Sequence, residues 1–278
     1  MGSICHSTSQ QHYYFYLPVW PKNANLILTI LFLQIVSNLT QLASQGHHPP
    51  ILWIQLDNPT GENKHKYMLA FASWLIHLGW FKEIVIFFLP PGYTHIDIDQ
   101  MFSTFAIWLL RNCLLFITSV IAALLSAYKK EPTRPSGSFL QTVFNWKGFF
   151  APHMHNVVGI TTAHAILVRK QPDGSVGIKF KAWHSSTEPW QGDSHHPSEW
   201  LRVLHSFPSG HPPPVPPTSL DIEATLTSVR SILPSDTSQD IKIKWEFFFR
   251  EKILYTQHYE QLPDNFWNFT RVRLFECF

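Results

Sequence analysis

The chain has 278 residues, which is enough for one large domain or two small ones. Charged residues make up only 14% of it, against about 25% in typical soluble domains, and the formal net charge is +2. The sequence therefore lacks the polybasic footprint of many nucleic-acid-binding proteins. Its three cysteines, Cys5, Cys113 and Cys277, are widely scattered and form neither a disulfide framework nor a zinc-binding spacing, so we expect an intracellular protein.

The N-terminal part predicts one strand followed by a helix. Residues Tyr13–Val19 are rich in aromatic residues and predict a strand, and Asn25–Leu42 predicts the helix after it. The apolar run Leu26–Val36 is about half as long as a bilayer-spanning helix, so we expect it to be buried in the protein. Residues Met1–Trp20 contain no aspartate or glutamate.

The next segment predicts a parallel β-α-β unit. Two short apolar runs, Ile51–Leu56 and Ile84–Leu89, predict buried strands, and Glu62–Leu78 between them has helical periodicity. Thr60 is a candidate N-cap and Gly79 a candidate C-terminal stop. Because the connection is long enough for a crossover, we expect the two strands to pair in parallel.

Two helices should pack through defined apolar stripes. The first, Glu62–Leu78, should bury one face, made of Tyr67, Phe71, Trp74 or Leu75, and Leu78. The second, Ile98–Leu110, should bury Met101 or Phe102, Phe105 and Leu109. Residues at this spacing lie on one side of an α-helix.

Acidic residues follow both predicted strands. Asp57 ends the first strand, and Asp97 and Asp99 come shortly after the second. Parallel strands end at the same sheet edge, so these carboxylates should converge there, where they could bind Mg²⁺ or Mn²⁺. Each has a simpler explanation: Asp57 can form an Asx turn, Asp97 can cap the helix, and Asp99 can interact with the helix dipole. His95 is a candidate base or ligand, or a turn residue that bonds to backbone.

The motifs around these acids resemble a known family. They read Leu56-Asp57-Asn58, Glu62-Asn63-Lys64, Gly92-Tyr93-Thr94-His95 and Asp97-Ile98-Asp99-Gln100-Met101-Phe102-Ser103. This pattern is similar to that of an uncharacterised eukaryotic domain family that looks transposon-derived, and the resemblance spans roughly 20–210. The resemblance implies a ribonuclease-H-like fold akin to DDE transposases, DNA as partner and a nuclear location. It also implies catalytic and metal-binding roles for Asp57, Asp97 and Asp99, with Asn58, Glu62, Asn63, Lys64, Thr94, His95 and Gln100 as further motif residues.

The sequence departs from this family where catalysis would need it most. Tyr93 stands where the family usually has histidine, and Ile96 where it usually has glutamate. A ribonuclease-H-like site also needs an acid on an earlier central strand, and the chain before Leu52 is too short for two earlier strands. We therefore expect an α/β fold with a truncated ribonuclease-H-like sheet, no catalytic activity and no cofactor, with Mg²⁺ or Mn²⁺ bound only if the ancestral site survives.

A second apolar run, Cys113–Tyr128, is a candidate membrane segment. Arg111 and Asn112 separate it from the preceding apolar residues, and the run alone is shorter than a bilayer span. We expect it to pack against the sheet, and membrane attachment is the alternative.

The remaining chain predicts a less regular α+β region. The predicted boundaries are a domain over 13–128, a linker over 129–138, a β-rich region over 139–207, and a Pro-rich segment with an aromatic tail over 208–278. Two strands, 157–169 and 176–183, should form a hairpin around Pro172-Asp173-Gly174, and a small helix should occupy 219–233. His153, His155 and His164 loosely resemble a zinc cluster, but no fourth ligand is evident.

The sequence thus favours a transposase-derived domain that has lost its catalytic activity. One alternative is a non-catalytic protein that binds another protein or a membrane. Another is residual metal-dependent nuclease or strand-transfer activity, with Asp57 and one of Asp97 and Asp99 bridging the metals.

Overall fold

The computed structural model describes most of the chain up to residue 247. The described residues are 1–16, 19–56, 65–89, 97–111, 135–155, 163–183, 186–192, 198–216, 221–232 and 238–247.

The chain divides into two compact units, each built from separate stretches of sequence. The first unit comprises Met1–Pro21, His95–Val143 and Pro214–Leu262, and the second comprises Lys22–Thr94, Phe144–Pro213 and Pro263–Phe278. These boundaries differ from the predicted sequential regions, because the chain leaves each unit and later returns to it.

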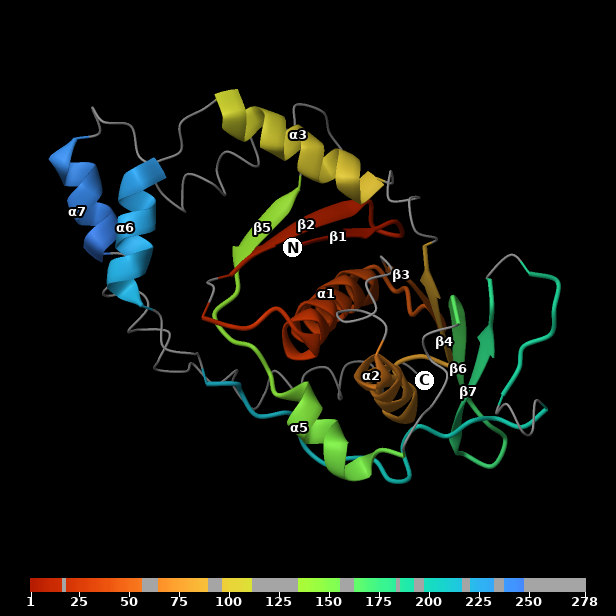
Figure 1. Cartoon of the computed structure of the whole chain (residues 1–278). Coiled ribbons are helices and arrows are strands. Elements are labelled where there is room, and N and C mark those ends of the chain that lie inside the picture. The colour runs from red at the N-terminus through yellow and green to blue at the C-terminus, as the bar shows by residue number, and fades with distance from the viewer. Residues whose placement is uncertain are drawn as a thin grey trace. The chain divides into compact units, whose positions relative to one another are not determined.

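The first unit contains a three-stranded sheet in the order β1-β2-β5 (Figure 1). Strands β1 (Gly2–Cys5) and β2 (Gln10–Phe15) pair antiparallel, and β2 pairs in parallel with β5 (Ser136–Phe139). The prediction of a single early strand over Tyr13–Val19 was therefore wrong, since a hairpin precedes the first helix. The predicted linker 129–138 was also wrong in part, because its last residues begin β5.

Helix α3 (Asp97–Arg111) packs on this first sheet. Phe105 is buried as predicted and lies 5.5 Å from the Tyr13 ring, measured between ring centroids. Phe102 remains 38% exposed although its ring meets Tyr13 edge-on. The side chains of Met101 and Leu109 lie outside the described residues. The unit ends in helices α6 (Ile222–Ile232) and α7 (Gln239–Phe247), which an Arg230–Glu246 ion pair joins.

The second unit is built on a mixed four-stranded sheet. Its strands are β3 (Ile51–Leu56), β4 (Glu83–Phe88), β6 (Ala165–Lys170) and β7 (Val176–Lys181), in the order β3-β4-β6-β7. Strands β3 and β4 are parallel neighbours, as predicted, with Ile51 opposite Glu83 and Leu56 opposite Phe88. The predicted β6–β7 hairpin is also confirmed, and Gly174 in its turn has φ +82°. The structure thus confirms a mixed α/β fold.

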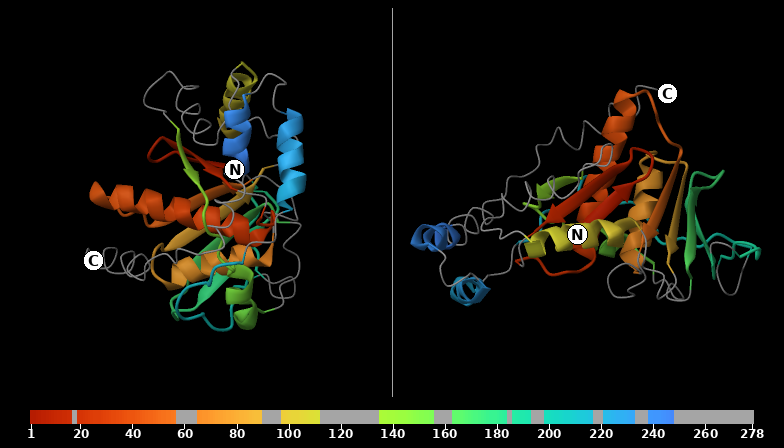
Figure 2. Two further views of the ribbon diagram at one scale, coloured as in Figure 1. Left: turned by 90° about the vertical axis from the view of Figure 1, so that its left-hand side faces the viewer. Right: turned by 90° about the horizontal axis from the view of Figure 1, so that it is seen from above.

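Helix α2 (Lys66–His77) covers one face of this sheet (Figures 1 and 2). It begins later than predicted, because the His65 side chain is the N-cap and accepts a hydrogen bond from the Met68 amide. It ends as predicted at Gly79, whose φ of +77° lets the Trp80 amide reach back to the Leu75 carbonyl. All residues from Met68 to Ile76 are buried, so the predicted stripe was too narrow there, and it was wrong for Tyr67 and Leu78, which are only half-buried.

Helix α1 (Ala24–Ser44) packs against α2 and against the short helix α5 (Trp146–Phe150). Its Thr29 hydroxyl is fully buried and accepts hydrogen bonds from the Phe144 amide (3.0 Å) and the Trp146 indole (3.1 Å). Among the described residues, α1 is the one helix long and apolar enough to cross a membrane, and 56% of its most apolar window is buried within the protein. The run Cys113–Tyr128 lies outside the described residues.

The sheet has two chemically different faces because side chains alternate along each strand. The helix face carries buried aliphatic and aromatic residues, among them Ile54, Ile86, Phe88, Ile166, Val168 and Ile178. The opposite face carries Trp53, Val85, Leu167, Arg169, Lys179 and Lys181, and we call it the cationic face. The prediction that β3 is a buried strand was wrong: only Ile54 is buried, and Trp53 is 55% exposed.

Candidate functional site

The predicted acidic site is only partly within the described residues. Asp57, Asn58, Glu62, Asn63, Lys64, Thr94 and His95 lie outside them. Asp97, Asp99 and Gln100 form the first turn of α3; Asp99 is half-buried and Gln100 is exposed, while the side chain of Asp97 is not described. Whether Asp57 meets the acids of α3 therefore stays a prediction.

The described residues bring basic and aromatic side chains together on the cationic face instead. Lys179 and Lys181 are two residues apart on β7 and point to the same side, and Arg169 lies there on the neighbouring strand β6. Glu83 lies opposite Arg169 on β4, so the face carries three cations and one carboxylate among its strand residues. The β6–β7 hairpin thus places three positive charges on one face of the sheet. This local concentration is not evident from the small net charge of the whole chain.

Two tryptophans from the segment after β7 lie beside these cations. Lys179 Nζ is 4.9 Å and the Arg169 guanidinium carbon 5.5 Å from the centroid of the Trp200 ring. Lys181 Nζ is 5.0 Å from the centroid of the Trp190 ring and 3.2 Å from the Ser186 carbonyl oxygen. Such cation–π contacts hold the charged ends in place along the face.

The same segment covers the outer edge of β7, and we call residues 186–192 and 198–204 the covering segment. Ile178 exchanges both backbone hydrogen bonds with Leu201 (2.8 and 3.0 Å), and Phe180 does so with Gln191 (2.6 and 2.8 Å). Trp200 lies very close to β7. If residue 177 had a Cβ atom, that atom would be only 2.6 Å from the Cβ of Trp200. Glycine at 177 is what allows this close approach.

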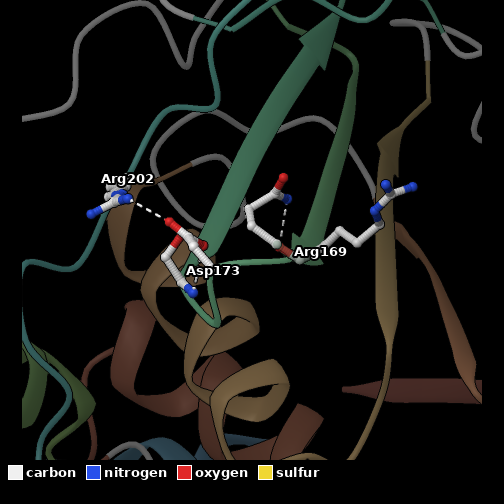
Figure 3. A network of polar contacts seen from close by, with 5 residues as sticks. Arg169, Asp173 and Arg202 are labelled. Carbon is white, nitrogen blue, oxygen red and sulfur yellow. Dashed lines mark hydrogen bonds and ion pairs between the residues drawn. The ribbon is translucent and has the colours of Figure 1, made fainter.

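The hairpin turn contains an ion pair between Arg202 and Asp173, in which Arg169 takes no part. Arg202 of the covering segment reaches Asp173 at 3.1 Å, whereas the side chain of Arg169 points away from it (Figure 3). Hydrogen bonds from the Ser175 hydroxyl and amide, helped by the charge of Arg202, lower the pKa of Asp173. Asp173 therefore neutralises Arg202 and leaves the charge of Arg169 on the cationic face.

Exposed aromatic rings complete this surface. Trp183, just past the end of β7, is 42% exposed and stacks on His164 with ring centroids 4.0 Å apart. Trp53 lies on the same face of the sheet on β3, in register with Val85, Leu167 and Lys179 across the strands. The face thus has cations over β6 and β7 and an exposed indole, that of Trp53, on β3, while Trp183 lies just past the end of β7.

The histidines are grouped differently from the prediction. His164 stacks on Trp183, so it is not the third member of the predicted His153–His155 cluster in this structure. The ring contacts of His153 and His155 are to His205, at centroid distances of 6.3 and 5.3 Å. Sequence reasoning missed His205 because it is about fifty residues away along the chain.

The cationic face could have been recognised in part from sequence. The Lys179-x-Lys181 pair on a predicted strand already places two charges on one side. The roles of Trp200 and Gly177 had no local indication, since they depend on a chain segment that returns to the sheet edge.

Comparison with known proteins gives a family but no activity. A family described as Domain of unknown function (DUF7869) matches residues 1–186. No curated protein and no solved structure matches the chain. Because the match covers well over half of the 278 residues, the chain belongs to this family of domains of unknown function.

Proposed function

We propose that the protein is a transposase-derived domain with a ribonuclease-H-like sheet that binds single-stranded nucleic acid without cutting it. The observation that carries the binding role is the cationic face, where Arg169, Lys179 and Lys181 lie on the same side of the sheet as the exposed Trp53 ring. Proteins that bind single strands combine a positively charged surface for phosphates with aromatic rings on which bases stack.

The charges and rings have separate roles in this proposal. Arg169, Lys179 and Lys181 contact successive phosphates, and the exposed rings of Trp183 and Trp53 offer stacking surfaces. Trp190 and Trp200 hold the lysine and arginine side chains in place through the cation–π contacts. With three phosphate contacts the affinity should be modest and should fall as salt increases, with a log–log slope of about −2 for a single strand.

The absence of catalysis rests on the sequence. Ile96 stands where the family's motif usually has an acid. Asp57, Asp97 and Asp99 are the remaining acids that would bind Mg²⁺ or Mn²⁺ if activity survived. With fewer carboxylates than such sites need, bound metal should be weak and phosphodiester cleavage absent.

Fluorescence anisotropy with a labelled 20-nucleotide single strand tests the binding role. The variant R169Q/K179Q/K181Q should lose most of the affinity and most of the salt dependence. The variant K66Q/K82Q/K147Q loses the same charge from outside the cationic face and should bind like the native protein. Equal losses in both variants, or no salt-dependent binding by the native protein, would contradict this role.

A nuclease assay tests the catalytic half separately. The native protein incubated with Mn²⁺ and labelled DNA should leave the DNA intact. Cleavage that disappears in Asp57→Ala would show that the ancestral site is functional.

The second candidate function is protein binding through β3. This strand lies at the end of the sheet order, and Ile51 and Trp53 are 42% and 55% exposed. An extended peptide can add to such an edge by backbone pairing. Peptide-type binding would be lost when a proline is placed at the exposed Gln55 of β3, whereas nucleic-acid binding through the three cations and Trp53 would persist.

A further inference from the structure

The three-stranded sheet of the first unit has a polar face on the side away from α3. Side chains alternate along a strand, so Tyr13 of β2 points towards Phe105 of α3 and His12 points to the other side. The register of β2 and β5 sets His12 beside Ser136, and Ser138 lies two residues further along β5 on the same face. The parallel pairing of β2 and β5 thus brings one histidine and two serines together (Figure 1).

Hydrogen bonds connect these three side chains in series. Ser136 Oγ lies 2.5 Å from His12 Nδ1, and Ser138 Oγ lies 2.8 Å from His12 Nε2. The Ser136 hydroxyl donates its proton to the Gln11 carbonyl at 3.3 Å, so it accepts from the ring, and Nδ1 carries the imidazole proton. Nε2 of the neutral ring then has a lone pair that accepts the hydrogen bond from the Ser138 hydroxyl. The bond from Ser136 to the backbone thus sets which ring nitrogen is the base.

The surroundings of His12 keep its ring uncharged. Burial lowers the pKa of His12 below its ordinary value, because the charged imidazolium is poorly solvated there. The other strand side chains on this face are those of Ser3, Cys5, Gln10 and Tyr14, so the strands place no carboxylate, lysine or arginine on it. At neutral pH the ring is therefore in the form that can take a proton from Ser138.

β5 also supplies a backbone donor next to Ser138. The Leu140 amide donates to the Phe15 carbonyl of β2 at 2.6 Å. Successive amides of a strand point in opposite directions, so the Phe139 amide faces the side of β5 away from β2, where the order of the described strands ends. The amide that follows a nucleophile can stabilise the oxyanion that forms when a carbonyl carbon is attacked.

We propose that Ser138 is a nucleophile towards uncharged carboxylic esters, with His12 as its general base and Ser136 as the residue that positions the ring. A hydroxyl that is hydrogen-bonded to a base, which is itself oriented by a third group, is the arrangement that activates a serine. The polar but uncharged strand side chains on this face favour an uncharged acyl group. The site depends on neither the cationic face nor the acidic motif.

The reaction is ester hydrolysis in two steps. Ser138 Oγ attacks the ester carbonyl carbon while its proton moves to His12 Nε2, and His12 then protonates the alcohol that leaves as the C–O bond breaks. Water next attacks the acyl group on Ser138 and gives a proton to His12. The carboxylic acid leaves as this proton returns to Ser138 Oγ, so ester and water become acid and alcohol.

A fluorophosphonate probe tests Ser138 directly, because an activated serine displaces its fluoride and keeps the phosphonyl group. The full native chain should be labelled at Ser138, as located by peptide mass spectrometry, and should not be labelled in denaturing urea. Ser138→Ala should abolish this label and the hydrolysis of p-nitrophenyl acetate. His12→Gln should slow both by about 10²- to 10⁴-fold, the usual contribution of a general base.

The positioning role of Ser136 has its own test. Ser136→Ala should slow labelling of Ser138, whereas Ser136→Thr keeps the hydroxyl and should preserve the native rate. The matched control is Ser206→Ala, because Ser206 Oγ also lies 2.8 Å from a histidine nitrogen, His153 Nδ1, in the second unit. This control should leave the labelling of Ser138 unchanged.

Far-UV circular dichroism checks that each variant is folded. The proposal is overturned if the folded native chain is not labelled at Ser138 or does not hydrolyse the ester. It is equally overturned if folded His12→Gln is labelled at the native rate, or if the label lies on Ser206, since any serine beside a histidine would then react. If His12→Gln does not fold, the folded and urea-denatured native chains and the Ser136 pair decide the question.

Discussion

The two edge strands of the four-stranded sheet differ: β7 is paired with the covering segment, whereas β3 has exposed apolar side chains. At β7 the covering segment takes up backbone groups of Ile178 and Phe180, and Trp200 packs directly over Gly177. At β3 the sheet order ends, and only Ile54 of that strand is buried among the described residues. An edge strand with exposed apolar side chains is a template for pairing with another chain.

The difference shows that strand sequence alone does not fix burial. β3 and β4 are both short and apolar, yet Ile84, Val85 and Ile86 are buried while Ile51 and Trp53 are exposed. Position in the sheet order decides this outcome, because a central strand has neighbours on both sides and an edge strand has one. The exposed apolar side chains thus lie on the strand that was predicted to be buried.

The largest expected difference in the free energy of unfolding is between two isoleucine-to-alanine substitutions, one at a buried position and one at an exposed position of the sheet. Ile86→Ala on the helix face should lower the free energy of unfolding by about 2–5 kcal/mol, because Ile86 is fully buried. Ile51→Ala on β3 should change it by less than about 0.5 kcal/mol. Urea unfolding followed by tryptophan fluorescence measures both. Similar losses would mean that β3 is covered in the protein.

A smaller effect should come from the closed edge itself. Gly177→Ala should cost about 1–3 kcal/mol, because the added Cβ meets the Trp200 Cβ, which cannot move without its backbone. Trp200→Gly should remove that clash, because glycine has no Cβ, so the double variant should be less destabilised than the sum of the single ones, with a coupling of about 0.5–3 kcal/mol. Strictly additive losses would show that Trp200 does not pack on Gly177.

The smallest expected change in the free energy of unfolding is that of a lysine substitution at Trp53 on β3. The same substitution should have a clear effect on aggregation. Trp53→Lys should leave the free energy of unfolding within about 0.5 kcal/mol of the native value. It should also slow aggregation, because a lysine on an edge strand disfavours pairing between sheets. Trp183→Lys adds the same charge away from β3 and is the matched control. Equal light-scattering traces for the two variants would indicate a general effect of charge.

Local sequence features predicted several elements correctly. The apolar runs at 51–56 and 84–89 with a helix-length connection gave the parallel pair, and Pro172-Asp173-Gly174 gave the hairpin. Gly79 marked the end of α2 because a left-handed residue is needed there. Each of these predictions depends on contacts between residues close in sequence, which propensity and turn chemistry determine.

Other features depend on partners far along the chain, and sequence did not predict them. β2 pairs with β5 across more than a hundred residues, and His153 meets His205 across about fifty. The candidate cationic face was visible in part as Lys179-x-Lys181, but its tryptophans reach it only through the covering segment. The acidic motif was recognised from the sequence, and the convergence of its carboxylates at one sheet edge stays a prediction.

The sequence by itself determined the helices α1, α2, α3 and α6, the β-α-β unit and the hairpin, because backbone conformational preferences and hydrophobic periodicity act over a few residues. Only the tertiary structure decided which strands lie at an edge, which lysines have an indole beside them, and which histidines share a face. Those outcomes follow from burial and strand pairing between distant segments, whose free energy no short stretch of sequence contains.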